Sequence, residues 1–527
     1  MGQIKDMTNI IEKVIKAFFV IMTGIILILL LFFSNTGYIC RKEFLFSNIV
    51  MMSGIILCII TGAAVFYCLR KYFDRYKIPY SLVVKILAVL LFLFQIYMAY
   101  NIYFRVGWDV NTVFKAAKQI AYGHSGQLNS SYFSRYSNNL FLASFYSVVL
   151  KAGRLAGICT KRGGEFLLII INCLISTASC MLIFNILRKF FGEKSAFAGF
   201  LLGIASFGIS PWVVVPYSDS VGLIFPVLIL YVYVRDEKSR AGKIFRYFLI
   251  IILSAVGYMI KPQIVIMPIA IIMTEAVHAF NDKNRKVILK KGFILVCGIV
   301  LSLTVFKCAD LMYEKEGFVI NKELSAGAPH FLKMGLNKDT NGVYSREDVD
   351  VSIAIATRKE RNRVNIDICK RRLADFGFKG YMLHLWKKTL VNYNDGTFAW
   401  GVEGGHFKKI YKAPDNKAAE VLRSFYYTDG KNHIKWGTFA QAVWLLILFL
   451  CFVSGICRTN EDNRKMYSVL LLAIMGLTAF ELLFEARARY LYAYTPVYCI
   501  LAGCGVHTLY YKNERSMLWR LRLMKEK

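Results

Sequence analysis

The chain has 527 residues, a formal net charge of +32 at pH 7 and a mean hydropathy of +0.46. Hydrophobic residues make up 56% of it and aromatic residues 15%, a composition too apolar for several soluble domains and too aromatic for a disordered chain. The 13 cysteines include no Cys-x-x-Cys pair, and most lie in apolar runs, which excludes a disulfide-stapled or zinc-ribbon fold. A multi-spanning membrane protein remains.

Apolar runs of about 20 residues, the length that crosses a bilayer as a helix, recur along the chain. The shorter run at 140–150 is expected to lie at the membrane interface rather than to cross. The sequence therefore predicts an all-α bundle of about twelve transmembrane helices, with interfacial helices and a small cap on the outer face. The expected spans are 14–33, 49–69, 82–103, 165–187, 196–214, 221–234, 244–260, 264–280, 292–312, 436–457, 466–484 and 490–510.

The distribution of lysine and arginine orients these spans. With an inside N-terminus, the inner segments hold 28 Lys and Arg residues, whereas the short outer connections hold 5. If 140–150 also crossed, the basic segments 235–246 and 281–291 would face outward, against this rule. We therefore expect a protein of the cell membrane with both termini in the cytoplasm. Much of its positive charge then faces anionic lipid, and no nucleic-acid partner is needed to explain it.

The span pattern divides the chain into four parts. Residues 1–81 form an N-terminal transmembrane hairpin, and residues 82–313 form a transmembrane core whose first outer loop is 104–164. Residues 314–430 contain no span and are expected to form an outer cap of helices. Residues 431–527 carry the last transmembrane helices and a cytoplasmic tail.

Several ionisable residues are expected at one depth, at the outer ends of the spans. Charged groups at membrane depth are functional-site candidates, but each has an ordinary structural explanation as well. An aspartate can cap a helix, a lysine can extend to lipid headgroups, and the arginines can bind headgroups or pair with Glu485. Their joint placement on one face favours a functional site. They are Asp109, Asp219, Lys261, Arg487 and Arg489.

The order of these motifs resembles the GT-C superfamily of polyprenyl-phosphate-sugar-dependent glycosyltransferases, which includes the protein O-mannosyltransferases and the aminoarabinose transferases. Trp108–Asp109 follows an early span, and Tyr136–Ser137–Asn138–Asn139 opens a second helix, as in the first outer loop of that superfamily. Two spans before residue 82, and Ser-Asn-Asn where many members carry Pro-Pro, depart from its pattern. Also similar are RKFFG at 188–192, PYSDS at 216–220, the Lys-Pro pair at 261–262 and RARYLYAYTP at 487–496.

The resemblance implies a membrane glycosyltransferase that moves a sugar from a polyprenyl phosphate to an acceptor hydroxyl outside the cell, with inversion, for cell-envelope glycan, lipid or protein modification. It implies Asp109 as the base. Asp219 would be a second catalytic carboxylate that orients acceptor or sugar, or helps to hold a divalent cation such as Mg²⁺ or Mn²⁺. The lipid phosphate would meet Lys261, Arg487 and Arg489. Sugar and acceptor would contact Trp108, Tyr136, Asn138, Asn139, Tyr217, Glu485 and Tyr490.

Two other functions share part of this pattern. A transporter or lipid flippase would carry ionisable groups near the bilayer midplane, often in two related halves. Here the groups cluster at one face, and no similarity between halves is visible. A polysaccharide polymerase would have a similar number of spans, a large outer loop and outer-face arginines, but it has no reason to carry the Trp108–Asp109 arrangement. Both stay open as alternatives.

Overall fold

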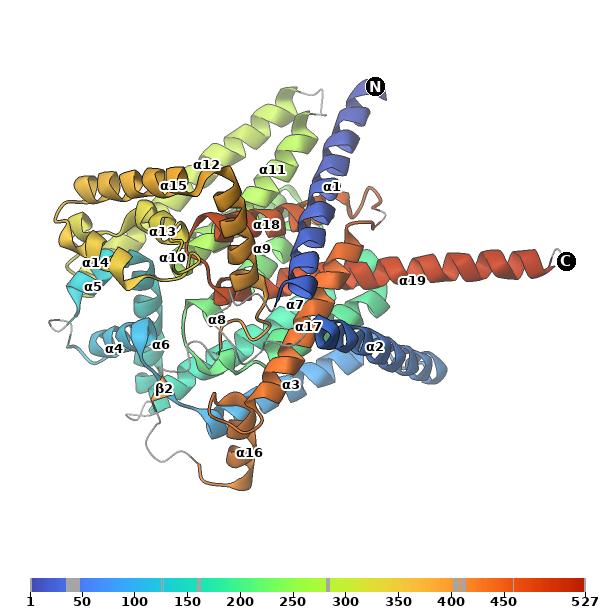
Figure 1. Cartoon of the computed structure of the whole chain (residues 1–527), viewed down its shortest axis with the longest axis horizontal. Helices are drawn as coiled ribbons and strands as arrows, with labels where there is room; N and C mark the ends of the chain where they lie inside the picture. The colour runs from blue at the N-terminus through green and yellow to red at the C-terminus, as the bar shows by residue number, and fades with distance from the viewer. Residues whose placement is uncertain are drawn as a thin grey trace.

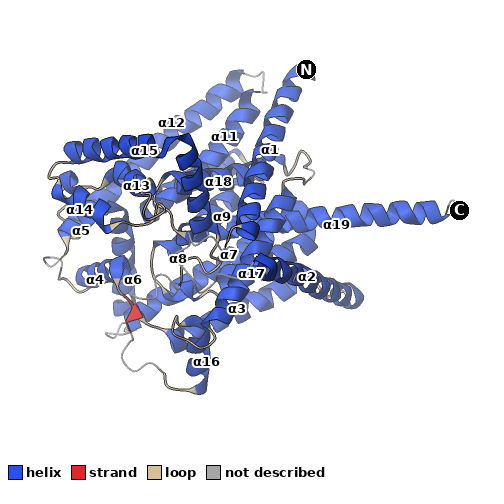
Figure 2. Ribbon diagram, in the orientation of Figure 1, coloured by secondary structure: helices blue, strands red, loops and turns tan. Residues whose placement is uncertain are grey.

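The computed structural model describes residues 2–34, 48–124, 126, 128–158, 163–280, 285–400, 407–408, 414–457 and 459–525. This part is mostly helical, and the strands β1 (Arg105–Val106) and β2 (Phe407–Lys408) form one short antiparallel pair (Figure 2). Helices suit a chain in a bilayer because each backbone N–H and C=O is bonded within its own segment. The chain is an all-α, polytopic membrane protein, as the sequence predicts.

The long helices carry the apolar sequence, and α1, α7 and α17 meet near the middle of the molecule while α2 and α19 project outward (Figure 1). Eight helical segments of the described chain are long and apolar enough to cross a membrane: Thr8–Phe32, Tyr80–Ile102, Gly164–Gly208, Arg240–Ile260, Pro262–Ala279, Ile288–Lys315, His433–Ser454 and Arg464–Leu483. The long helices themselves are α1 (Gly2–Phe32), α2 (Asn48–Tyr76), α3 (Tyr80–Ile102), α7 (Gly163–Gly203), α10 (Arg240–Ile260), α11 (Ile266–Phe280), α12 (Arg285–Lys315), α17 (His433–Ser454), α18 (Arg464–Leu483) and α19 (Thr495–Lys525).

These eight segments are fewer than the twelve expected spans, and helix geometry explains part of the difference. The runs 165–187 and 196–214 lie on two helices that meet at Gly192, whose φ of 79° and ψ of 171° are not helical, so the segment Gly164–Gly208 holds two of the expected runs. The run 221–234 falls on the shorter helices α8 (Ser218–Gly222) and α9 (Ile224–Tyr233). The runs 49–69 and 490–510 fall on α2 and on η8 (Ala488–Tyr494) with α19, which are not among the eight.

The two arms of α7 pack closely beyond Gly192. A Cβ atom at Gly199 would lie 2.3 Å from Leu187 Cδ1, and one at Gly503 of α19 would lie 2.4 Å from the same atom. The Gly-x-x-x-Gly spacing of Gly199 and Gly203 therefore allows close helix packing. Helix α19 packs against both α7 and α17, and it therefore lies in the interior of the bundle.

The helices α4, α5 and α14 lie at the end of the molecule away from both termini (Figure 1). Helix α6 covers the interfacial run 140–150, packs against α4 and α7, and is not among the eight candidate spans. The remaining elements are α4 (Trp108–Ala121), α5 (Ser130–Arg135), η2 (Ser137–Asn139), α6 (Leu140–Leu155), η3 (Ile204–Gly208), η4 (Pro211–Val214), η5 (Pro262–Val265), η6 (Lys322–Leu324), α13 (Gly327–Gly335), α14 (Arg346–Ala354), α15 (Arg358–Tyr393) and α16 (Lys417–Tyr426).

One non-helical stretch of the segment 314–430 enters the bundle. Residues 394–400, which directly follow α15, are all buried. Asp395 accepts a hydrogen bond of 2.8 Å from the backbone N–H of Thr397, and the Gly396 N–H donates to Gln441 Oε1 at 2.6 Å. These bonds satisfy backbone groups that water cannot reach, which lets an irregular loop lie inside the protein.

Candidate functional site

Asp109 is the meeting point of three segments that are distant in sequence. It lies half-buried in the first turn of α4, whose N-cap is Gly107. The Tyr217 hydroxyl lies 3.4 Å from Asp109 Oδ2 and 3.3 Å from Asn139 Oδ1, so it can donate to either oxygen. Tyr217 and Asn139 are both buried. Asp109 is therefore not the helix cap, and its side chain faces a polar cluster.

Trp108 links this cluster to a cation. It begins α4 with a φ of 28°, a left-handed conformation that residues other than glycine seldom adopt. Its ring meets that of Tyr217 edge to face, with 5.0 Å between centroids. The guanidinium carbon of Arg489 lies 4.7 Å from the centroid of the same indole. Backbone strain of this kind is commonly stored where a side chain must be held for a function.

Lys261 and Asp219 form a buried ion pair where the turn between α10 and η5 meets α8. Only 6% of Lys261 and 1% of Asp219 are exposed. The N-cap of α8 is Tyr217, so Asp219 is not its cap. Lys261 is likewise not a side chain that reaches to headgroups, because its ammonium group is bound inside the protein. Its Nζ atom lies 5.2 Å from the centroid of the Tyr490 ring.

Tyr490 joins the two halves of this arrangement. Its hydroxyl donates to Glu485 Oε1 at 3.1 Å, and its carbonyl oxygen accepts a hydrogen bond from the Gln263 side chain. The Arg489 guanidinium carbon lies 5.3 Å from the centroid of the Tyr490 ring, in addition to its contact with Trp108. The rings of Trp108 and Tyr490 therefore both border Arg489, and Tyr490 also borders Lys261.

The other predicted residues lie near this cluster. Asn138 Nδ2 donates to Asn139 Oδ1 at 3.3 Å, and the ring of Tyr136 lies 5.3 Å from that of Tyr132. Arg487 is half-buried at the N-cap of η8, two residues before Arg489. The contacts above thus join predicted residues of α4, η2 and α8, the turn at Lys261, and η8 in one cluster.

Tyr132 belongs to the cluster although the sequence analysis did not select it. Asn139 Nδ2 donates to its hydroxyl at 2.7 Å. Burial raises the pKa of Tyr132 far above its usual value, and the nearby Tyr217 and Asp109 raise it further. The hydroxyl therefore stays protonated and acts as a hydrogen-bonding group. Its only sequence signal is its place in the polar-aromatic run at 132–141.

Lys388 and Glu481 are two further charged residues that the sequence analysis missed. Lys388 Nζ donates to the carbonyl oxygens of Leu482 and Phe484, at 2.7 and 2.6 Å, and so binds the end of α18. Burial lowers the pKa of Lys388 to about 7. Glu481 is fully buried in α18, within electrostatic range of Lys388 and Lys261. A glutamate inside the apolar run 466–484 was the available signal.

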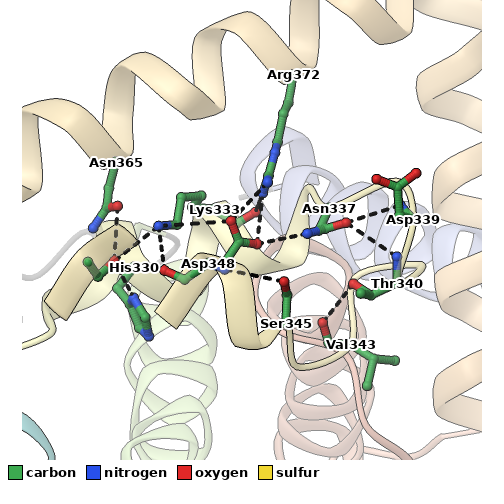
Figure 3. A network of polar contacts seen from close by, with 11 residues as sticks. His330, Lys333, Asn337, Asp339, Thr340, Val343, Ser345, Asp348, Asn365 and Arg372 are labelled. Carbon is green, nitrogen blue, oxygen red and sulfur yellow. Dashed lines mark hydrogen bonds and ion pairs between the residues drawn. The ribbon is translucent and has the colours of Figure 1, made fainter. Parts of the chain in front are cut away.

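A second polar cluster holds α13, α14 and α15 together (Figure 3). Asp348 accepts hydrogen bonds from Arg372 Nη2 at 2.8 Å and from Asn337 Nδ2 at 2.9 Å. Lys333 is fully buried and donates to the Asp348 carbonyl at 2.7 Å and to Ser352 Oγ at 3.0 Å. Each charged group here has both a counter-charge and hydrogen bonds, so we interpret the cluster as structural.

The site does not fit a divalent cation. The Asp219 carboxylate, the proposed ligand, is bonded to the Lys261 ammonium group. Within the part of the chain that the structure describes, no three His, Cys, Asp or Glu side chains are placed to hold a metal ion. Hard cations such as Mg²⁺ require several oxygen ligands. We therefore assign no step to a metal.

The fold and the apolar helices define an integral, multi-pass membrane protein that lies in the lipid bilayer. Residues 7–509 match a family described as conserved hypothetical integral membrane protein, and the chain belongs to this family. That description names no activity. No curated protein and no solved structure matches the chain.

Proposed function

We propose that the protein is a GT-C-like glycosyltransferase that moves a sugar from a polyprenyl phosphate to an acceptor hydroxyl at the outer membrane face. The observation that carries this proposal is the link between a carboxylate and a cation. Asp109 and Arg489 are joined through Trp108 and Tyr217, although they are far apart in the sequence. Group transfer from a lipid phosphate needs this combination: a proton acceptor on one side and a cation on the other.

Asp109 is the proposed general base. A carboxylate in contact with an acceptor hydroxyl takes its proton as the oxygen attacks, and general base catalysis of this kind contributes about 10²–10⁴-fold in rate. The half-buried position of Asp109 leaves room for an acceptor, while Tyr217 fixes the orientation of its carboxylate. Asn138 and Asn139 lie beside it with amide groups suited to sugar hydroxyls.

Arg489 and Lys261 are the proposed phosphate-binding cations, with Arg487 beside them. The leaving phosphate gains negative charge in the transition state, and preorganised cations stabilise that charge. Lys261 is already bonded to Asp219, so Asp219 holds the ammonium group in place rather than taking part in proton transfer. The phosphate would share Lys261 with Asp219 and meet Arg489 directly.

The step balances as a single displacement. The acceptor oxygen forms a bond to the anomeric carbon while the bond from that carbon to the phosphate oxygen breaks. The acceptor proton goes to Asp109, and the electron pair of the broken bond goes to the lipid phosphate. One base and no enzyme nucleophile predict inversion at the anomeric carbon.

The segment 314–430 is the proposed cover of this site. The backbone N–H of Ala486 donates to the carbonyl oxygen of Gly342 at 2.7 Å. That contact lies one residue before Arg487, so the position of the cover is coupled to the arginine-bearing turn. Covers of this kind exclude water from transfer reactions.

The test is transfer in proteoliposomes that contain the purified protein. Polyprenyl-phosphate sugars, each labelled in the sugar, are supplied with an extract of cell-envelope acceptors. The proposal expects labelled acceptor, released polyprenyl phosphate and an inverted linkage. Intact donor that crosses the bilayer without cleavage would identify a flippase instead, and products that grow by repeat units would identify a polymerase.

A further inference from the structure

A groove between α10, α11 and α12 lies apart from the site described above. It encloses about 620 Å³, within the range of small-molecule and cofactor sites. Its walls are almost entirely apolar, with Ile250 from α10, Ile271 and Ile272 from α11, and Leu295 and Ile299 from α12. Helix α12 packs against both α10 and α11, and Figure 1 shows α11 and α12 at the edge of the bundle.

The groove is open on the side that faces away from the helix bundle. Its lining residues Ile272 and Leu295 are 44% and 43% exposed. Helix α12 forms one wall and is exposed beyond it as well, with Phe293 at 69% and Val300 at 59%. Because α10, α11 and α12 all carry candidate membrane spans, the surroundings of this opening are lipid.

One end of the groove is charged. Glu275 forms ion pairs with Lys291 at 2.8 Å and with Lys465 at 3.0 Å, and both Glu275 and Lys291 line the groove. Two ammonium groups against one carboxylate leave a net positive charge. The Tyr233 hydroxyl donates to Glu275 Oε1 at 2.7 Å, and Arg246 lies within electrostatic range of Tyr233. This end is therefore a positively charged pocket at the border of an apolar groove.

The charged end is distant from the proposed transfer site. Lys261 directly precedes the helical segment Pro262–Ala279, and Glu275 lies near the other end of this segment. At 1.5 Å per residue they are separated by about 20 Å along this helix. In the orientation expected from the distribution of lysine and arginine, the Glu275 end faces the cytoplasm, where anionic lipids are most abundant.

We propose that this groove binds one anionic phospholipid. Its acyl chains lie between α10, α11 and α12, and its phosphate contacts Lys291 and Lys465. The apolar walls pack against the acyl chains, and the excess positive charge at one end of the groove selects an anionic headgroup. The inference does not depend on the proposed glycosyltransferase activity.

The experiment uses the full-length protein in detergent and compares phosphatidylglycerol with phosphatidylcholine of the same acyl chains by native mass spectrometry. We expect one phosphatidylglycerol to be retained at least tenfold more tightly than phosphatidylcholine. Ala276→Phe places a ring in the groove and should weaken retention at least tenfold. Met273→Phe, on the same helix at a position 49% exposed that does not line the groove, should change it less than twofold.

A second pair of variants tests the headgroup contact. Lys291→Arg should keep the preference for phosphatidylglycerol, whereas Lys291→Gln should reduce it at least threefold. Equal retention of the two lipids, or equal effects of the two phenylalanine variants, would overturn the proposal. Tighter retention of polyprenyl phosphate than of phosphatidylglycerol would also overturn it. So would a rise in melting temperature with inorganic phosphate alone that equals the rise with phosphatidylglycerol.

Discussion

The guanidinium carbon of Arg489 lies 4.7 Å from the centroid of the Trp108 indole ring. Trp108 directly precedes Asp109, the proposed base, and η8 places Arg489 beside Lys261 through their shared contact with Tyr490. A cation over an indole face is stabilised by about 0.5–2 kcal/mol. In the proposed reaction this one contact sets the distance between the proton acceptor and the phosphate-binding cation.

The first prediction concerns the shape of that cation. Arg489→Lys keeps the charge but loses the planar group that stacks on Trp108, so transfer should fall about tenfold or more. Arg489→Gln removes the charge as well and should cost about 10²-fold. The matched control is Arg346→Lys on the surface, where the side chain is 75% exposed. Steady-state transfer rates check this, and equal rates for Arg489→Lys and wild type would contradict the stacking role.

The second prediction concerns the buried pair of Lys261 and Asp219. Removal of one partner leaves a buried charge without its counter-charge, which costs about 3–5 kcal/mol in general. Asp219→Asn should therefore lower the free energy of unfolding by about that amount. The double variant Asp219→Asn with Lys261→Met should be more stable than the sum of the two single effects predicts. Thermal unfolding in detergent measures this cycle, and additive effects would show that the pair is not coupled.

The third prediction follows from the lowered pKa of Lys388. Its folded pKa of about 7 lies below that of an exposed lysine, so the folded state binds fewer protons than the unfolded state between these values. Stability should therefore rise with pH from about 7 to about 10.4, by up to about 1.4 kcal/mol per pH unit. Below pH 7 the contribution of Lys388 to the free energy of unfolding no longer changes with pH.

Lys388→Met should flatten this rise, because no ammonium group then has to be buried at the end of α18. Lys379→Met, at an exposed position of the same helix, is the control and should keep the wild-type slope. Unfolding midpoints in denaturant at several pH values measure the effect. A Lys388→Met profile as steep as that of the wild type would rule out Lys388 as its source.

The fourth prediction concerns the contact between α13 and the end of α18. A Cβ atom at Gly335 would lie 2.5 Å from the carbonyl oxygens of Leu483 and Phe484, and these backbone atoms cannot rotate away. Gly335→Ala should cost about 1–3 kcal/mol and make the segment 314–430 more sensitive to protease. At Gly380 the nearest atom would be 3.6 Å away, so Gly380→Ala should leave digestion unchanged. Equal digestion of both variants would mean that the contact is not required.

The membrane class and the helical fold could be predicted from the sequence, because apolar runs of span length have no other stable form in lipid. The pattern also placed Asp109, Asp219, Lys261 and Arg489 at one depth, since each stands near the expected end of a span, whereas Trp108 and Tyr217 were indicated only by the resemblance. It also separated the runs 165–187 and 196–214, and the structure ends one helix and begins the next at the non-helical Gly192 between them. It did not reveal that the run 221–234 divides between the shorter helices α8 and α9.

Pairings within the site could not be predicted in the same way. The ion pair of Lys261 and Asp219 depends on how α8 meets the turn after α10, and the stacking of Arg489 on Trp108 joins two segments that are far apart in the sequence. Both are long-range contacts that no local pattern encodes. Lys388 was missed for a similar reason, since its basic, amphipathic surroundings suggested an exposed helix rather than a buried ammonium group.

The assignment of Asp109 as the base is tested most directly by Asp109→Asn in the proteoliposome transfer assay. The asparagine keeps the size of the side chain and its contact with Tyr217 but cannot accept the proton. Asp350→Asn, at an exposed position of α14, is the control. The account predicts a loss of about 10²–10⁴-fold in the transfer rate at saturating donor, with donor binding within about threefold and the control unchanged. A fully active Asp109→Asn protein would contradict it.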